Sequence, residues 1–273
     1  MKHYKTLKTQ TTLLTLLFLI SVIIVFGLKP VTIVLVVGTL TVMGFIWRLF
    51  RALQRQIGDQ QFQNFRQLET LSGLYNTLDI QHPLPLTRHT AASPDFLHLL
   101  ANEIFRLRPL LIVEVGSGTS TLVAAYCLKK IGQGKIISLD HLEKYASITQ
   151  QTIKSHDLDN FAEVVYSPLK TYEKDGASLL WYDDSVLKPV DSIDLLIVDG
   201  PPKGVSELAR YPALPLLKDK LHEGSIVLLD DGARVEETKT VALWEKELGL
   251  TSSFHSMEKG AFLCYFRKKQ DGA

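Results

Sequence analysis

Two long apolar runs at the start of the chain predict a pair of membrane-spanning helices. Residues 11–28 carry no charge, and residues 31–47 carry none after a break at Lys29-Pro30. Each run is about as long as a helix that crosses the hydrocarbon layer. A cleaved signal peptide would have a short apolar core and a small-residue cleavage site, which this pattern lacks. We therefore expect a helical hairpin anchor over residues 1–48. The alternative is a hairpin that enters one leaflet without crossing.

The basic residues around these runs predict their orientation. Lysines occupy positions 2, 5 and 8, arginines occupy positions 48, 51 and 55, and Lys29 alone lies between the runs. Cytoplasmic flanks of membrane helices are enriched in Lys and Arg, so both flanks are expected on that side. This predicts a multi-pass protein of the cell (inner) membrane, with everything after Trp47 in the cytoplasm.

Residues 49–80 predict an amphipathic helix that links the anchor to the rest of the chain. Their apolar residues recur at three- and four-residue steps among Gln, Arg and Asn. The apolar side would either pack on its own domain or form a homodimer contact. Gly58 and Gly73 disfavour one continuous rod, because glycine lowers helix stability.

From residue 81 onward, short apolar runs alternate with helical stretches, which predicts an α/β domain over residues 81–273 with a doubly wound, mostly parallel sheet. Residues 170–191 are expected to carry a helix at the edge of a pocket. The expected strands cover 110–115, 135–141, 161–169, 193–200 and 224–231, the expected helices begin near residues 93, 120, 142 and 236, and residues 251–257 and 261–268 form a terminal β-hairpin.

The segment before the first strand, residues 81–94, contains three prolines and ends where a helix begins. Ser93 is the expected N-cap of that helix, with Pro94 in its first turn. A segment that enters an open α/β sheet at this point can cover the ligand crevice. Arg88 and His89 are therefore candidates for lining a substrate pocket, and a solvated loop is the alternative.

Composition adds two constraints. The chain has 30 basic and 29 acidic residues, a net charge of +1, so no nucleic-acid partner is expected. Its two cysteines, Cys127 and Cys264, lie in apolar runs. We expect both to be buried and reduced, without a disulfide, in agreement with a cytoplasmic domain.

A glycine turn after the first strand gives the first functional signal. Residues 110–121 read L-L-I-V-E-V-G-S-G-T-S-T, and such glycines let a ligand approach the backbone N–H groups that begin a helix. A dinucleotide site would need a third glycine where Thr121 stands. Glu114 would repel a pyrophosphate and attract a cationic sulfonium. The candidate residues for binding S-adenosylmethionine, rather than NAD, are Glu114, Gly116, Ser117, Gly118 and Thr121.

The second strand ends in Asp140, about 20 residues beyond the turn, where nucleotide-binding folds place the carboxylate that binds ribose. The alternative role for Asp140 is to cap the helix that follows. His141 comes next and is a candidate both for the cofactor site and for a general base. Ser167 ends the third strand and is expected beside the adenine.

Three carboxylates are expected at the carboxyl edge of the sheet. Asp199 ends the fourth strand, and Asp230 and Asp231 end the fifth. Clustered acids need compensation. Mg²⁺ or another divalent cation, holding a substrate hydroxylate beside the methyl group, would supply it. Alternatively, Asp199 orients the amino group of the methyl donor, while Asp230 and Asp231 pair with Arg234. Both interpretations remain open.

Residues 94–267 resemble the class I S-adenosylmethionine-dependent methyltransferases, and most closely the bacterial subgroup called methyltransferase family 24. The resembling segments are A-A-S-P-D-F-L, E-V-G-S-G-T-S-T, S-L-D-H, D-G-P-P, R-Y-P-A-L-P and L-L-D-D-G-A-R. The resemblance implies a seven-stranded sheet with an antiparallel last strand and the cofactor at its carboxyl edge. It gives the cofactor turn to Glu114, Gly116 and Gly118, the ribose-binding acid to Asp140, and the acid after the fourth strand to Asp199.

The chain is also similar to metal-dependent O-methyltransferases of the catechol type, which have acids at the positions of Asp199, Asp230 and Asp231. Those enzymes place a catalytic lysine three residues after the first acid, where this chain has Pro202, followed by Lys203. The implied function is membrane-anchored methyl transfer to an oxygen of a small-molecule or lipid-like acceptor. Its catalytic candidates are Asp199, Lys203 and His141. The rival function is a non-catalytic, membrane-tethered module that binds the cofactor or a partner.

Overall fold

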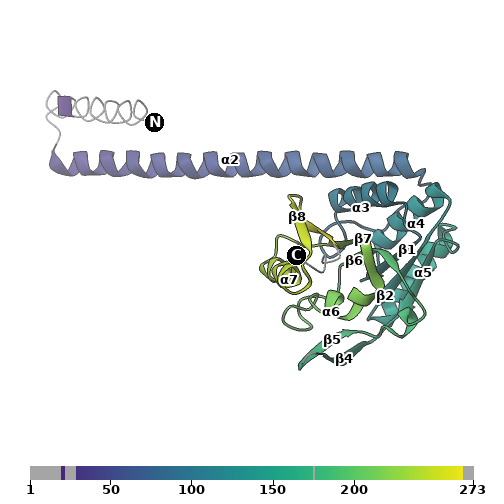
Figure 1. Ribbon diagram of the computed structural model, residues 1–273. Coiled ribbons are helices and arrows are strands. Elements are labelled where there is room, and N and C mark those ends of the chain that lie inside the picture. The colour runs from purple at the N-terminus through teal and green to yellow at the C-terminus, as the bar shows by residue number, and fades with distance from the viewer. Residues whose placement is uncertain (1–19, 22–28, 175, 267–273) are drawn as a thin grey trace. The chain divides into compact units, whose positions relative to one another are not determined.

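The computed structural model describes residues 20–21, 29–174 and 176–266 (Figure 1). The chain forms two units, residues 1–64 and residues 65–273. The first predicted membrane helix, residues 11–28, lies outside the described residues except for Ile20 and Ser21. The predicted helical hairpin is therefore not shown.

Helix α2 (Pro30–Leu78) runs without interruption. It contains both the second predicted membrane segment and the predicted linker helix. The expectation that Gly58 and Gly73 disfavour a continuous helix is wrong. Each glycine costs about 1 kcal/mol relative to alanine, and the good helix formers around them tolerate that cost.

One part of α2 is strongly apolar. An 18-residue window within the helix has a mean hydropathy of 2.1, so among the described residues this one helix is long and apolar enough to cross a membrane. Its large apolar side chains are exposed, including Val34 (71% exposed) and Met43 (66% exposed). Exposure of this extent in a run of apolar residues indicates an interaction site.

A seven-stranded sheet forms the centre of residues 65–273. Its strands are β1 (Leu111–Val115), β2 (Lys135–Asp140), β3 (Ala162–Tyr166), β6 (Ile193–Val198), β7 (Leu221–Leu229), β8 (Thr251–His255) and β9 (Ala261–Tyr265). They are arranged in the order β3-β2-β1-β6-β7-β9-β8. Strands β1, β2, β3, β6 and β7 pair in parallel, and β9 is antiparallel to β7 and β8. The predicted doubly wound sheet and its antiparallel last strand are confirmed.

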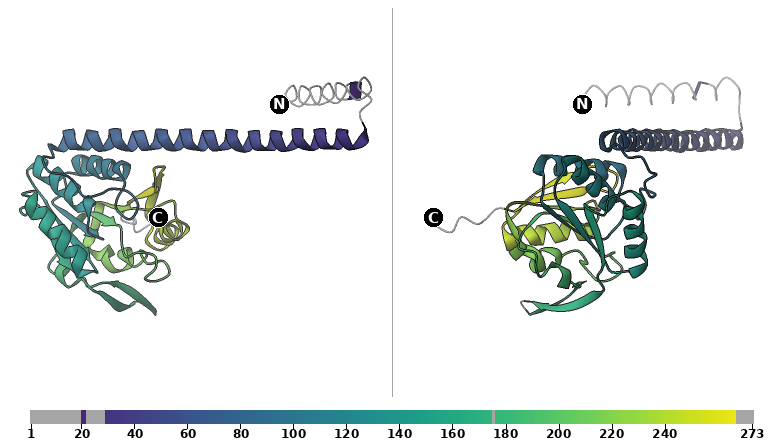
Figure 2. Two further views of the ribbon diagram at one scale, coloured as in Figure 1. Left: turned by 180° about the vertical axis from the view of Figure 1, so that it is seen from behind. Right: turned by 90° about the vertical axis from the view of Figure 1, so that its right-hand side faces the viewer.

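Helices cover both faces of this sheet (Figure 2). On one face lie α3 (Pro94–Leu107), α4 (Thr119–Ile131) and α5 (Glu143–Ser155), and on the other lie α6 (Ala213–Leu217) and α7 (Val235–Leu248). Side chains alternate along β1, so Ile112 packs on the side of α3, α4 and α5, and Val113 and Val115 pack on the side of α6 and α7. Cys127 and Cys264 are free and buried, as predicted.

Residues 169–182 differ from the prediction. They form an antiparallel hairpin of β4 (Leu169–Lys174) and β5 (Ala177–Tyr182), followed by a 3₁₀ turn at Ser185–Leu187. The helix expected in this segment is wrong. The sequence contains the dipeptide Asp-Gly at 175–176, a strong hairpin signal, and the flanking residues include the aromatic Tyr172, Trp181 and Tyr182, which favour strands. The hairpin delivers Tyr182 to the interior, where it is buried.

Helix α3 begins at Pro94 with Ser93 as its N-cap residue, as predicted, but the Ser93 side chain forms no capping hydrogen bond. The Ser93 hydroxyl instead donates to Asp95 Oδ1 (2.5 Å). Asp95 Oδ2 accepts bonds from Gln67 Nε2 of α2 (2.7 Å) and from the backbone N–H of Glu258, in the turn between β8 and β9 (2.8 Å). Burial would raise the pKa of Asp95, but these hydrogen bonds lower it overall. Asp95 therefore joins three segments that are far apart in the sequence.

Candidate active site

Glu114 is fully buried at the carboxyl end of β1. Its Oε2 accepts hydrogen bonds from Thr121 Oγ1 (2.5 Å) and Ser138 Oγ (2.6 Å). Its Oε1 forms no hydrogen bond of normal length and angle among the described residues, although the nearby Ser120 hydroxyl also acts to lower the pKa of Glu114. Burial raises the pKa of Glu114 to about 7, although the hydroxyl groups around it act in the opposite direction. A buried carboxyl group with one unused oxygen is suited to binding a cationic ligand group.

Glycine is needed for different structural reasons at the two positions of the turn. Gly116 has a φ of +97°, and a Cβ at this position would lie 2.8 Å from the backbone oxygen of Asp199. Glycine is required there by the close approach of the end of β6. A Cβ at Gly118 would meet no described atom within 4 Å. The missing side chain therefore leaves room beside the N-terminus of α4 only at Gly118. From the sequence, both glycines were expected to make room for a ligand. At Gly116 the glycine is required instead by the nearby backbone of Asp199.

Asp140 ends β2 next to this turn. Its Oδ2 accepts hydrogen bonds from the hydroxyl (2.7 Å) and the backbone N–H (3.2 Å) of Ser117. Its Oδ1 accepts one from the backbone N–H of Leu142 (3.0 Å), just before α5. The second contact ends just before α5, whose N-cap residue is Leu142 and which has no side-chain capping bond, so the alternative helix-capping role of Asp140 is not observed. Each carboxylate oxygen can accept more than one bond, so Asp140 retains the capacity to bind ribose hydroxyls.

His141 and Ser167 flank Asp140. The His141 Nδ1 lies 3.8 Å from Asp140 Oδ1 and has no hydrogen-bond partner within the described part of the chain. The Ser167 backbone N–H donates to the backbone oxygen of Asp140 (2.7 Å), and its hydroxyl donates to the backbone oxygen of Asp183 (2.6 Å). His141 therefore follows β2 directly, and Ser167 follows β3 beside it; their roles toward a cofactor stay predictions.

Tyr182 is a site residue that the sequence did not indicate. Its ring packs edge-on against His141, with ring centroids 5.8 Å apart. Its hydroxyl is buried and has no partner in the segments described, and a Cβ at Gly200 would lie 2.1 Å from it. Burial, together with the nearby carboxylates of Asp140 and Asp199, raises the pKa of Tyr182 well above its ordinary value. The hairpin thus brings a neutral hydroxyl to the ends of β1 and β6.

The three predicted acids at the carboxyl edge come together. Asp199, Asp230 and Asp231 each have a carboxylate oxygen within 4.8 Å of the other two. Asp230 and Asp231 are buried at the end of β7. Burial raises the pKa of Asp199 well above its ordinary value, and it also raises the pKa of Asp230.

Arg210, in the loop before α6, lies among these acids. Its Nη2 donates to Asp231 Oδ2 (2.7 Å) and Asp199 Oδ1 (3.1 Å), and its Nη1 donates to the backbone oxygen of Asp230 (2.8 Å). The side chain is 6% exposed. Burial would lower the pKa of Arg210, but the charges of Asp199 and Asp231 raise it. The sequence did not indicate this role, because the contacts join residues from separate elements.

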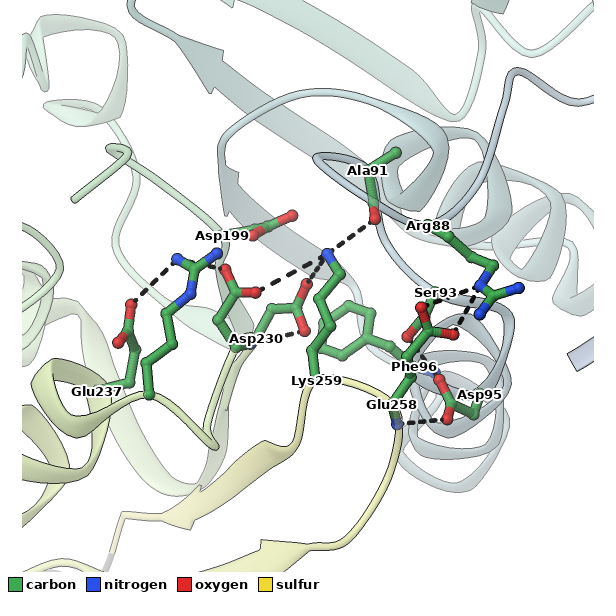
Figure 3. A network of polar contacts seen from close by, with 12 residues as sticks. Arg88, Ala91, Ser93, Asp95, Phe96, Asp199, Asp230, Glu237, Glu258 and Lys259 are labelled. Atoms are coloured by element: carbon green, nitrogen blue, oxygen red, sulfur yellow. Dashed lines mark hydrogen bonds and ion pairs between the residues drawn. The ribbon is translucent and has the colours of Figure 1, made fainter. Parts of the chain in front are cut away.

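Further charged residues surround the acids (Figure 3). Lys259, in the turn between β8 and β9, has its Nζ 3.6 Å from Asp230 Oδ2 and 3.8 Å from Asp231 Oδ1. Oε1 of Glu237, on α7, lies 3.8 Å from Nη1 of Arg210. Arg234 lies 2.9 Å from Asp231, so the pairing expected from the sequence is present at that acid.

The glycine turn, Asp140 and the three acids Asp199, Asp230 and Asp231 all fall within one family match. A family model described as a methyltransferase domain matches residues 113–232. The chain therefore contains a methyltransferase domain. The resemblance stated from the sequence is thereby confirmed. No curated protein matches the sequence of this methyltransferase.

Solved structures share the fold of the methyltransferase. The SAH-bound methyltransferase PaMTH1 of Podospora anserina is 14% identical with a TM-score of 0.53, and the match covers 73% of this chain and 88% of that chain. The O-methyltransferase of Bacillus cereus, solved in complex with SAH, is 15% identical with a TM-score of 0.50, and the match covers 73% of this chain and 91% of that chain.

Three predicted residues of the methyltransferase lie at the margin of the site. Lys203 is exposed in the loop after β6 and lines a small recess with Arg210 and Glu237. Arg88 forms an ion pair with Glu258 (2.8 Å), and His89 is exposed.

Proposed function

We propose that this methyltransferase is anchored in a membrane and transfers the methyl group of S-adenosylmethionine to an oxygen of a small-molecule or lipid-like acceptor. One observation carries the donor half of this proposal. Glu114 and Asp140 flank a glycine turn, and Glu114 has a buried oxygen without a partner among the described residues. This arrangement suits a ligand that is cationic at one end and carries ribose hydroxyls at the other.

Each part of the proposed donor, S-adenosylmethionine, would contact a particular residue. Glu114 binds the cationic amino-acid end of the donor, and Asp140 accepts hydrogen bonds from the ribose. Gly118 leaves the N-terminus of α4 accessible, where a Cβ would meet no described atom within 4 Å. Ser117 orients Asp140 through its hydroxyl (2.7 Å). Ser167 lines the adenine side.

The acceptor half of the proposal rests on the acids beside the donor site. The donor supplies an electrophilic methyl group on a sulfonium. The chain must hold the acceptor oxygen in line with the C–S bond and take its proton. An O–C bond forms, the C–S bond breaks with its electron pair passing to sulfur, and the proton passes to a base. Asp199 and His141 are the favoured bases, and the exposed Lys203 is a third candidate.

Oxygen is the proposed acceptor atom for two reasons. A cluster of carboxylates is suited to receiving a proton from a hydroxyl group. The similar protein of Bacillus cereus is also described as an O-methyltransferase. A lipid-like acceptor is supported by the exposed apolar segment of α2, which would hold the enzyme at a bilayer. The multi-pass arrangement, the cytoplasmic orientation and a homodimer through the linker helix stay predictions.

Titration calorimetry of the full chain in detergent micelles tests the donor site. We expect S-adenosylmethionine to bind and NAD not to bind. Asp140→Ala should weaken donor binding at least about 100-fold, because hydrogen bonds to a charged group are worth about 1.5–3 kcal/mol each. Asp159→Ala is the matched control, since Asp159 is exposed before β3. Binding of NAD with no heat from S-adenosylmethionine would refute the assignment.

A transfer assay separates the enzyme from the rival, non-catalytic module. The full chain is incubated with donor carrying a labelled methyl group and with lipid and small-molecule extracts. We expect label in a product that mild acid and base hydrolysis identify as an ether or ester of oxygen. Tight donor binding with no labelled product in either extract would favour the cofactor-binding module.

A further inference from the structure

The acid cluster was interpreted from the sequence as a candidate divalent-metal site, and its contacts test that interpretation. Two of the three acids already share one cationic group. Nη2 of Arg210 lies 2.7 Å from Asp231 Oδ2 and 3.1 Å from Asp199 Oδ1. A cation that used these same oxygens would have to displace the guanidinium group from them. The residues present therefore fit an arginine better than they fit a metal ion.

The charge balance points the same way. Together with the three acids of the cluster, the carboxyl group of Glu237 brings the number of carboxyl groups in this region to four. Three cationic side chains face them: Arg210 and Arg234 reach Asp231 and Glu237, and Lys259 lies 3.6 Å from Asp230 Oδ2. A divalent cation placed among these groups would meet repulsion from all three. Metal sites of hard cations are built instead from oxygen ligands that lack such competitors.

Arginine is suited to this position for a physical reason. Its guanidinium group stays charged at all ordinary pH values and presents several N–H donors in one plane. Here that plane spans the ends of two strands, because Nη1 also donates to the backbone oxygen of Asp230 (2.8 Å). A side chain that is 6% exposed and bonded in this way has little freedom to leave. The guanidinium therefore fixes the distance between the end of β6 and the end of β7.

We propose that Arg210 takes the place of a divalent cation in this enzyme, holding Asp199 and Asp231 in position so that methyl transfer requires no metal. Arg210 is thus a positioning residue that acts through Asp199. This inference rests on the proposed function for its role in catalysis. Its structural part, which cation occupies the cluster, can be tested separately. The acceptor need not carry two neighbouring oxygens that chelate a metal.

Mn²⁺ binding to the full chain, followed by electron paramagnetic resonance, tests the proposal. Wild-type protein should show no saturable Mn²⁺ site up to about 1 mM. Arg210→Gln removes the resident cation and should create one, with binding at least about tenfold tighter than in wild type. Arg210→Lys keeps a charge and should not create the site. Arg234→Gln is the matched control, because Arg234 is 43% exposed and touches Asp231 but not Asp199.

One outcome does not depend on the folding of the Arg210 variants. Stoichiometric Mn²⁺ binding by the wild-type chain that disappears in Asp230→Asn would overturn the proposal by itself. So would a stable, folded Arg210→Gln variant that binds no more Mn²⁺ than wild type. Titration of the same samples with S-adenosylmethionine measures donor binding, which tests the proposed function independently. A wild-type chain that binds neither Mn²⁺ nor the donor would leave Arg210 as the resident cation and refute the donor site.

Discussion

Glu114 shows how a single buried side chain can couple ligand binding to pH. It has its Oε2 bonded to Thr121 and Ser138 and its Oε1 unused within the described residues. The charge of Asp140 further disfavours ionisation of Glu114. Without ligand, the carboxyl group is therefore half protonated near neutral pH. A cationic ligand would favour its ionised form.

Glu114→Gln should change how stability depends on pH. Burial raises the folded-state pKa from 4.5 to about 7, so the folded chain holds a proton that the unfolded chain releases. The stabilisation from this proton is complete below pH 4.5 and is lost as the pH rises through about 7. Wild type should therefore lose up to about 3 kcal/mol relative to Glu114→Gln across this window.

Urea unfolding of both proteins, carried out at several pH values in the same micelles, measures this difference. A difference that stays constant across the window would show that Glu114 does not titrate there. The affinity for S-adenosylmethionine should show the opposite trend in wild type. It should rise by up to about tenfold through neutral pH and stay flat in Glu114→Gln, apart from the titration of the donor itself.

The two turn glycines provide a matched pair of substitutions. Gly116→Ala should lower the free energy of unfolding by about 1–3 kcal/mol, because φ is +97° and the new Cβ would lie 2.8 Å from Asp199 O. Gly118→Ala should leave stability within about 1 kcal/mol and weaken donor binding at least about tenfold. Urea unfolding and donor titration of each variant measure both effects. Equal loss of stability in the two variants would contradict this division of roles.

At the scale of elements, the turn between β8 and β9 closes the site from the far end of the chain. Glu258 donates its backbone N–H to Asp95, and its side chain pairs with Arg88. The adjacent Lys259 donates to the backbone oxygen of Ala91 (2.8 Å) and faces Asp230. A structural hairpin at the edge of the sheet thus contributes a charge to the acid cluster.

Lys259→Met should reveal this contribution. Removing the ammonium leaves the Ala91 oxygen without that donor and brings no replacement cation to the buried Asp230. We expect a loss of about 1–3 kcal/mol in the free energy of unfolding. Lys239→Met, at an exposed position on α7, should stay within about 0.5 kcal/mol of wild type. Urea unfolding at neutral pH compares the two variants. Equal free energies of unfolding would show that Lys259 does not stabilise the acid cluster.

The sequence predicted those parts of the site that lie within continuous segments. The glycine turn and Asp140 were found because one follows a strand and the other comes at a fixed interval beyond it. The roles of Arg210 and Lys259 could not be found in this way, since each meets the acids only after distant elements pack together. Tyr182 was missed for a different reason. Its segment was interpreted as a helix, although an Asp-Gly dipeptide at 175–176 indicated a hairpin.

At the scale of the whole molecule, the apolar part of α2 predicts how the protein partitions. The full chain should float with phospholipid vesicles in a density gradient. Lysine in place of both Val37 and Leu40, which are exposed in the apolar segment, should abolish flotation, because a charge at the centre of a membrane helix costs about 3 kcal/mol. Lysine in place of Leu53 and Ile57, in the later part of α2, is the control and should leave flotation unchanged. Wild-type protein that forms oligomers and does not float with vesicles would contradict the proposal that α2 anchors the protein in a membrane.

Asp95 also sets the limits of a minimal catalyst. Gln67, Ser93 and Glu258 meet at its carboxylate, although they come from opposite ends of residues 65–273. A polypeptide trimmed to residues 113–232 would discard all four residues and strip β7 of its neighbour β9. An engineer who transplants this catalyst into another host protein must therefore start upstream of Gln67 and continue past Tyr265.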